Sequence, residues 1–230
     1  MLNKLKKDLK KASNKKQAVL LQRFFKMGKG QYGEGDIFLG IKVPIQRSTA
    51  KRYDLGLEDI QKLLNSKIHE ERLIGLFILI SKYKKSDENL KEEIYKFYLK
   101  NSKRINNWDL VDLSSHKIVG NYLLDKDRKI LYELAKSSNL WEKRISVIST
   151  FAFINDGDFK DSLAIAEILL GDAHDLIHKA VGWMLREIGK RDKKVLEGFL
   201  KKYYKAMPRT MLRYAIEKFS EKERKIWMKE

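Results

Sequence analysis

Trp108 and Asp112 are the two residues whose types and spacing best suit chemistry in this chain. They lie four positions apart, so on a helix they share one face, one turn from each other. An ionised Asp can stabilise positive charge and orient an attacking water, and an indole face attracts cations through its quadrupole. The pair therefore suits a substrate that develops positive charge, such as the oxocarbenium ion formed when an N-glycosidic bond breaks.

The residues around this pair indicate a helix that is neither fully solvated nor fully buried. The apolar residues of the segment are Trp108, Leu110, Val111 and Leu113. Asp109 and Asp112 are too polar for a helix that is buried on all sides. We expect a helix at the edge of a cleft. An ordinary core Trp with an exposed Asp is the alternative that these residues leave open.

A repeat of amphipathic helices positions the pair within the chain. Successive amphipathic helices of about 12–16 residues contain the equivalent positions Arg72, Trp108, Arg144, Lys179 and Arg213, at steps of 36, 36, 35 and 34 residues. Further helical segments lie around residues 57–65, 89–99, 127–136, 159–170 and 193–205. A helix pair at this period is typical of an α-solenoid, and because the TPR consensus is absent the HEAT-like type is favoured. The predicted fold is all-α, a HEAT-like α-solenoid of stacked antiparallel helix pairs with a concave basic face.

The N-terminal part differs from the repeats. Residues 2–12 and 15–27 are predicted helices, with Asn14 capping the second, and a Gly-rich loop follows at 28–36. The loop contains Gly28-x-Gly30-x-x-Gly33, but no strand precedes it and no helix opens directly after it, so we expect a flexible connection. Residues 38–44 are predicted to be extended, with Pro44 in the first turn of the next helix. We expect one domain over residues 1–230, with the repeats over 37–230.

The register of the repeat predicts a basic furrow. Four of the five equivalent positions are cationic and the fifth is Trp108. One turn later come Asp112 and, two repeats on, Trp183, which gives a Trp-Asp-Trp group among cations. Such stripes suit nucleic acid, and Arg144 could hold a phosphate beside the reacting sugar. The alternative is that the arginines tie neighbouring repeats together.

Composition points the same way and excludes several classes of function. The formal charge of +18 favours a polyanionic partner, although a Lys-rich composition can also reflect an AT-rich genome. With no Cys, disulfides and thiol chemistry are excluded. His174 and His178 are predicted to be a surface pair, because a third metal ligand is missing. With no long apolar run, we expect a soluble, cytoplasmic protein that associates with the nucleoid when bound to DNA.

Five segments resemble the AlkD-type DNA alkylation repair enzymes, a HEAT-like repeat family of DNA glycosylases. They are residues 38–44 with Arg47, residues 106–112, residues 141–147 with Thr150 and Phe151, residues 179–189, and residues 207–209. The resemblance covers essentially the whole chain. The resemblance implies excision of bases made cationic by alkylation, chiefly at N3 and N7 of purines, in double-stranded DNA. It implies a monomer without cofactor or metal.

The resemblance also implies roles for individual residues. Trp108 and Trp183 look like the indoles that contact the deoxyribose, and Asp112 looks like the carboxylate that stabilises the sugar cation and positions water. Arg144 resembles the arginine beside the lesion phosphate. Phe24 stands where the better-known branch has Tyr, which points to a different substrate range. The predicted DNA-binding residues are Phe24, Arg47, Arg72, Lys179, Arg186 and Arg213. A non-catalytic binder of DNA or RNA and a protein-interaction solenoid are the competing hypotheses.

Overall fold

The computed structural model of the protein describes residues 1–229, and these residues fold into helices joined by short turns. Within this range the β pairing consists of one isolated parallel bridge, between Ile37 and Ile68. The chain divides into two compact units, Met1–Ser114 and Ser115–Glu230. We describe each unit by itself. The prediction of one domain over the whole chain stays a prediction.

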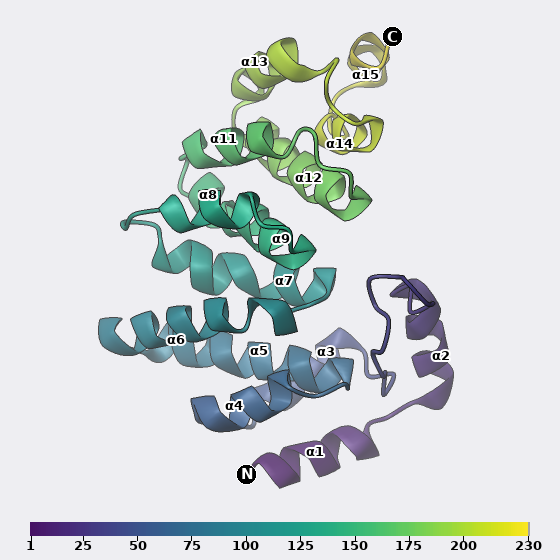
Figure 1. Cartoon of the computed structure of the whole chain (residues 1–230), viewed down its shortest axis with the longest axis vertical. Coiled ribbons are helices and arrows are strands. Elements are labelled where there is room, and N and C mark those ends of the chain that lie inside the picture. The colour runs from purple at the N-terminus through teal and green to yellow at the C-terminus, as the bar shows by residue number, and fades with distance from the viewer. Residues whose placement is uncertain (230) are drawn as a thin grey trace. The chain divides into compact units, whose positions relative to one another are not determined.

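The first unit contains α1 to α6 and carries α7 at its end. Its helices are α1 (Leu2–Lys11), α2 (Lys15–Phe24), α3 (Val43–Ala50), α4 (Leu57–Leu64), α5 (His69–Lys85), α6 (Glu88–Lys100), a 3-10 turn (Ser102–Arg104) and α7 (Trp108–Ser115). The central helix is α5, which packs against α3, α4 and α6 (Figure 1). Most of α5 is buried, including the four charged or polar residues of its first turn. Those charges must find partners inside the unit.

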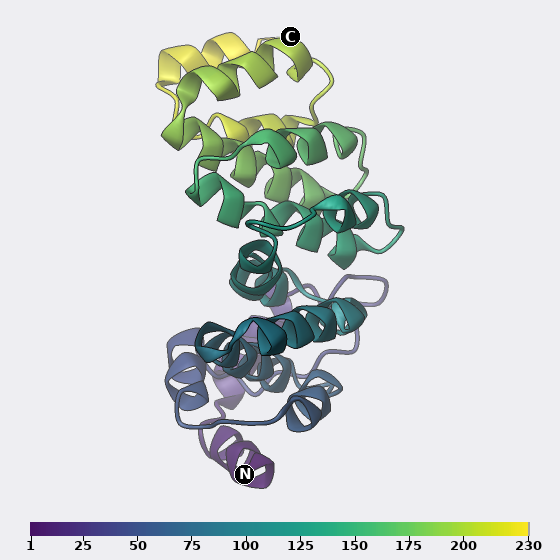
Figure 2. The same cartoon turned by 90° about the vertical axis from the view of Figure 1, so that its left-hand side faces the viewer.

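The second unit follows the same pattern of paired helices. It contains a π-helical turn (His116–Gly120), α8 (Lys129–Ala135), α9 (Leu140–Ser149), α10 (Phe151–Asn155), α11 (Lys160–Ile168), α12 (Asp175–Arg191), α13 (Lys193–Tyr203), α14 (Arg209–Ala215) and α15 (Glu221–Trp227). Helix α9 packs against α8 and α12, and α12 also packs against α13 and α14 (Figures 1 and 2). The long α12 is therefore the central helix of this unit.

The local signals of the sequence are confirmed. The Asn14 side chain accepts a hydrogen bond from the Gln17 N–H and caps α2, and Pro44 lies in the first turn of α3. Every predicted helix is present, but the helices at the five equivalent positions, expected to be about 12–16 residues long, range from 7 residues in α14 to 17 in α5 and α12. None of the helices formed by residues 1–229 is long and apolar enough to cross a membrane.

The connection between α2 and α3 is more ordered than its glycines suggest. Gly40 has φ +81°, and a Cβ there would lie 2.1 Å from the Asn14 carbonyl oxygen. The buried Glu70 carboxylate accepts hydrogen bonds from the N–H groups of Leu39, Gly40 and Ile41. These residues follow the Gly-rich loop and were predicted to be extended, and they are thus fastened to the start of α5.

Candidate functional site

The site residues of the first unit lie on the first two turns of α7. The Asn107 side chain accepts a hydrogen bond from the Trp108 N–H (2.8 Å), and the Asp109 side chain accepts one from the Leu110 N–H (2.9 Å). Both acceptors satisfy N–H groups that a helix start leaves without partners. Trp108 and Asp112 are each half-buried, one turn apart. Their predicted placement on one helix is confirmed, whereas the cleft expected beside that helix stays a prediction.

Two phenylalanines contact the Trp108 indole, and a third packs behind them. The Trp108 ring stacks on Phe25, with centroids 5.2 Å apart and an angle of 18°. Phe25 stacks in turn on Phe38 at 5.0 Å, and the edge of Phe24 meets Trp108 at 5.7 Å. Phe24 itself is 62% exposed. One face of the indole is therefore covered from within the unit, and an exposed aromatic ring lies beside it.

A chain of buried charges lies behind α7. His69 at the start of α5 donates from Nε2 to Asp109 Oδ2 (2.8 Å) and from Nδ1 to Asp36 Oδ2 (3.3 Å). The Arg72 guanidinium donates to the same oxygen of Asp36 (2.6 Å) and to the Ser66 carbonyl (2.9 Å). This charge chain consists of Asp36, His69, Arg72 and Asp109, and all four side chains are buried. With His69 protonated, two positive and two negative groups are paired in the interior.

The pKa values fit this pairing. Burial alone would lower the pKa of His69, but the charge and hydrogen bond of Asp109, with the hydrogen bond of Asp36, raise that pKa to about 9. Burial opposes ionisation of Asp36 as well, yet the hydrogen bond from His69 and the charge of Arg72 keep the pKa of Asp36 below its usual value. His69 is therefore an imidazolium at neutral pH.

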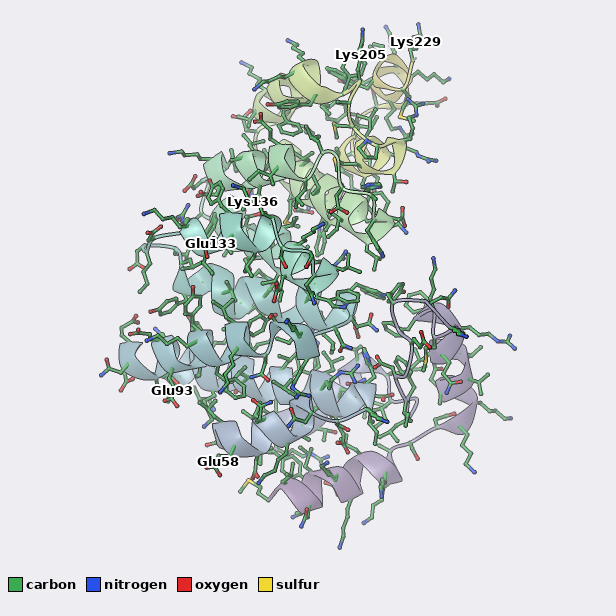
Figure 3. All side chains as sticks on the ribbon, in the orientation of Figure 1. Glu58, Glu93, Glu133, Lys136, Lys205 and Lys229 are labelled. Carbon is green, nitrogen blue, oxygen red and sulfur yellow. The ribbon has the colours of Figure 1, made fainter. Side chains whose placement is uncertain are left out.

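Arg47 on α3 is exposed, and its guanidinium lies over the Phe77 ring, 4.8 Å from the centroid. Such stacking holds the planar cation in one place while its edge stays in water. Figure 3 shows the carboxylates of Glu58 on α4 and Glu93 on α6 on the side of the unit away from α2.

In the second unit, Arg144 on α9 is buried and donates from Nη1 to the Leu176 carbonyl at the start of α12. Lys179 is half-buried and forms an ion pair with Asp175 (2.7 Å). The Arg144 contact links two neighbouring helices of the repeat, which is the alternative that the sequence left open for its arginines.

Trp183 on α12 is half-buried, and its indole N–H donates to Glu187 (3.2 Å). Its ring lies 6.0 Å from that of Phe151. Burial would raise the pKa of Glu187, but hydrogen bonds from Lys190, Arg191 and Trp183 lower it, so Glu187 is ionised. A charged acceptor thus fixes the orientation of the indole.

The two remaining arginines of the predicted DNA-binding set differ in their surroundings. Arg186 forms an ion pair with Glu217, whereas Arg213 on α14 is exposed and donates to the Arg209 carbonyl (3.4 Å). His174 caps α12, and His178 donates to the Asp172 carbonyl. Over residues 1–229, no group of three His, Cys, Asp or Glu side chains is arranged to hold a metal ion.

Comparison with known proteins places the chain in a family. A model of the family described as DNA alkylation repair enzyme matches residues 5–219. The chain belongs to the DNA alkylation repair enzyme family. A solved structure, "Predicted DNA alkylation repair enzyme from Enterococcus faecalis", is similar with a TM-score of 0.70 and 14% sequence identity, covering 91% of this chain and 97% of that one. No curated protein sequence matches.

These findings confirm the family resemblance and the α-solenoid fold class predicted from the sequence. At 14% identity the structural likeness speaks for the fold alone. The assignment of the repeats to the HEAT type, the concave basic face and the roles of single residues stay predictions for this DNA alkylation repair family member.

One predicted DNA-binding residue of this family member needs correction. Arg72 is only 3% exposed, and its guanidinium is engaged by Asp36 and Ser66. A burial of this kind leaves no room for a phosphate, so Arg72 is an interior ion-pair partner. The predicted cationic stripe is interrupted at this position, because the side chain points into the unit.

Sequence reasoning also missed His69, Asp36 and Asp109. It treated Asp109 as too polar to be buried, and it placed Asp36 at the end of a flexible loop. The available signal was the polar start of the run from His69 to Ile80, since charges that open an almost wholly apolar helix require buried partners. The sequence does not show which residues those partners are.

The stability of this alkylation repair family member is expected to fall as the pH rises above neutrality. The pKa of His69 rises on folding from 6.5 to about 9, so its stabilising contribution is complete below pH 6.5 and is lost as the pH passes about 9. A shift of this size corresponds to about 3 kcal/mol at most. Urea unfolding of the wild type and of His69→Gln between about pH 6 and pH 9 measures it. The same pH dependence in both proteins would contradict the assignment.

Proposed function

We propose that this DNA alkylation repair family member is a DNA glycosylase that removes cationic N3- and N7-alkylated purines from duplex DNA. The observation that carries the proposal is the placement on α7 of a half-buried carboxylate, Asp112, one turn from a half-buried indole, Trp108. A family that acts on alkylated DNA and a carboxylate beside an aromatic ring together favour chemistry through a sugar cation.

The reaction follows from the charge of the substrate. An alkylated purine already carries a positive charge, so the bond between C1′ and the base nitrogen breaks with both electrons passing to the base, which leaves neutral. The deoxyribose is left as an oxocarbenium ion. The Asp112 carboxylate stabilises that cation and orients a water, whose oxygen bonds to C1′ while its proton passes to the carboxylate or to solvent. Because the leaving group needs no proton, no general acid is required.

Trp108 acts as a rigid surface for the sugar in this proposal. Its inner face is covered by Phe25, and the neighbouring Phe24 is exposed. The indole quadrupole adds to the attraction for the developing cation, and exclusion of water strengthens that attraction. Phe24 is proposed to contact the DNA beside the lesion.

Further residues are proposed to contact the DNA on the strength of the resemblance. Trp183 is proposed to contact deoxyribose, and Arg47, Lys179, Arg186 and Arg213 the backbone. Arg144 is as buried as Arg72 and donates to the Leu176 carbonyl, so its proposed contact with a phosphate requires that hydrogen bond to open. Duplex DNA with alkylated bases is the proposed partner, and a monomer without cofactor is the proposed form. Each contact is tested by its own substitution.

The exposed Arg213 gives a direct test of backbone contact. Arg213→Gln is expected to weaken binding to all duplex sequences alike and to reduce the slope of log K against log salt by about one, since one released counterion is lost. Fluorescence anisotropy across a salt series measures both quantities. Lys96→Gln on α6 is the control, because it removes the same charge from an exposed lysine outside the predicted set. An equal loss in both variants would argue against a specific contact.

The proposed activity itself is tested by incubating the protein with duplex DNA that contains 7-methylguanine and measuring the free base. Release of the base by the wild type supports the glycosylase. Tight, strongly salt-dependent binding without release would favour the non-catalytic nucleic-acid binder. Weak binding with a shallow salt dependence would favour the protein-interaction solenoid.

A further inference from the structure

The buried charge chain of the first unit ends next to the proposed site. Asp109, which accepts from His69, directly follows Trp108 in the first turn of α7. Asp112 lies on the same short helix, three residues further on. A shift of this turn would therefore move both proposed site residues together.

A second, independent set of contacts links His69 to the Trp108 side chain. The imidazole stacks on Phe38 at 4.6 Å and lies 5.0 Å from Phe25, and Phe25 stacks on Trp108. Both the backbone of Trp108, through Asp109, and its ring, through Phe25, are thus tied to the same imidazole. The ties come from α5, from Phe25, which directly follows α2, and from Asp36 and Phe38 in the connection between α2 and α3.

Stability alone is a weak reason for this arrangement. Taking two cations and two anions out of water is costly, and well-packed apolar residues of similar volume are often as stabilising. What a hydrogen-bonded chain of buried charges adds is a single geometry, because any displacement leaves a buried charge unpaired. The charged groups that face His69 are Asp36, Asp109 and Arg72. Both carboxylates pair with His69, and Arg72 pairs with Asp36.

We propose that His69, with Asp36, Arg72 and Asp109, is a positioning device that fixes the first turn of α7 and thereby the Trp108 ring for the reaction. The inference rests on the proposed glycosylase function, which it deepens by adding residues that touch neither substrate nor reacting atoms. It also assigns a role to the end of the Gly-rich connection, since Asp36 is the anchor that this connection delivers.

The test uses Asp109→Asn, which keeps the shape of the side chain and removes its charge. A misplacement of about 1 Å costs on the order of a hundredfold in rate, and this milder change is expected to lower single-turnover base release by about tenfold. Duplex affinity is expected to stay near that of the wild type. Asp36→Asn, at the far side of His69, is expected to act in the same direction with a smaller effect.

Glu71→Gln is the matched control. Like Asp109, Glu71 on α5 is a buried carboxylate with a cationic partner, which is Lys6. Glu71 lies outside the charge chain. The second readout is the ¹⁹F spectrum of protein labelled with fluorotryptophan, in which the four Trp give four signals and Trp108→Phe identifies one. The Trp108 signal is expected to shift or broaden in Asp109→Asn and Asp36→Asn, and to keep its wild-type position in Glu71→Gln.

The outcomes separate the two proposals. If the wild type releases no base, the glycosylase proposal fails. The ¹⁹F signal of Trp108 still decides whether the charge chain positions the Trp108 ring. An unchanged Trp108 signal in folded Asp109→Asn overturns the positioning proposal, as does an equal change in Glu71→Gln. If both Asn variants fail to fold, the charge chain is needed for folding itself, and the positioning proposal is likewise overturned.

Discussion

Asp112→Asn is expected to lower the single-turnover rate of base release by about 10²- to 10³-fold while leaving duplex binding nearly unchanged. The asparagine side chain has the same shape, so the packing of α7 is kept. Only the negative charge is lost, and with it the stabilisation of the sugar cation and the acceptor for the proton of water. A loss confined to the rate shows that the charge acts in the transition state and not in binding.

The measurement compares base release with anisotropy of the same labelled duplex. Asp156→Asn is the control, because it removes a carboxylate that is exposed and outside the proposed site. Full activity in Asp112→Asn would remove the proposed role of this carboxylate. A parallel loss of affinity and rate would instead indicate a contact made equally in the ground state.

Arg72→Met is expected to lower the free energy of unfolding by about 3–5 kcal/mol, since it leaves the Asp36 carboxylate buried without its guanidinium partner. Methionine roughly fills the space of the arginine stem, so the effect comes from the unpaired charge and the lost hydrogen bond to Ser66. Asp36→Asn in the Arg72→Met background is expected to recover part of the loss, because the unpaired charge is removed.

Urea unfolding of the single and double variants measures these effects. Arg213→Gln serves as the control, since an exposed arginine away from such networks is expected to change stability by about 0.5 kcal/mol or less. Unchanged stability in Arg72→Met, together with weaker and less salt-dependent DNA binding, would restore the DNA-contact role that its burial argues against.

How far the sequence predicted the fold depends on the range of the interactions. The helix pairs were predicted correctly because the 3.6-residue periodicity and the spacing of the repeat are local patterns. The Asn14 cap and the place of Pro44 were predicted for the same reason. The anchoring of the residues after the Gly-rich loop was not predicted, because the Glu70 carboxylate that binds the N–H groups of Leu39, Gly40 and Ile41 comes about 30 residues later in the chain.

The fate of the arginines shows the same limit. The sequence placed Arg72 and Arg213 at equivalent positions of the repeat, and the structure shows one buried and the other exposed. The difference is the presence of Asp36, which reaches Arg72 across 36 residues of sequence. Periodicity gives the side of a helix, whereas the neighbouring elements decide whether that side faces water.

The sequence by itself determined the helical repeat, the family, and the pairing of Trp108 with Asp112 on one helix, because all three depend on residue types at short or regular spacings. Only the tertiary structure decided what holds that helix. His69 contacts Asp109, Asp36 contacts His69, and Arg72 contacts Asp36, from distant parts of the first unit. Buried charges need partners, and which residues these are is fixed only when the protein has folded.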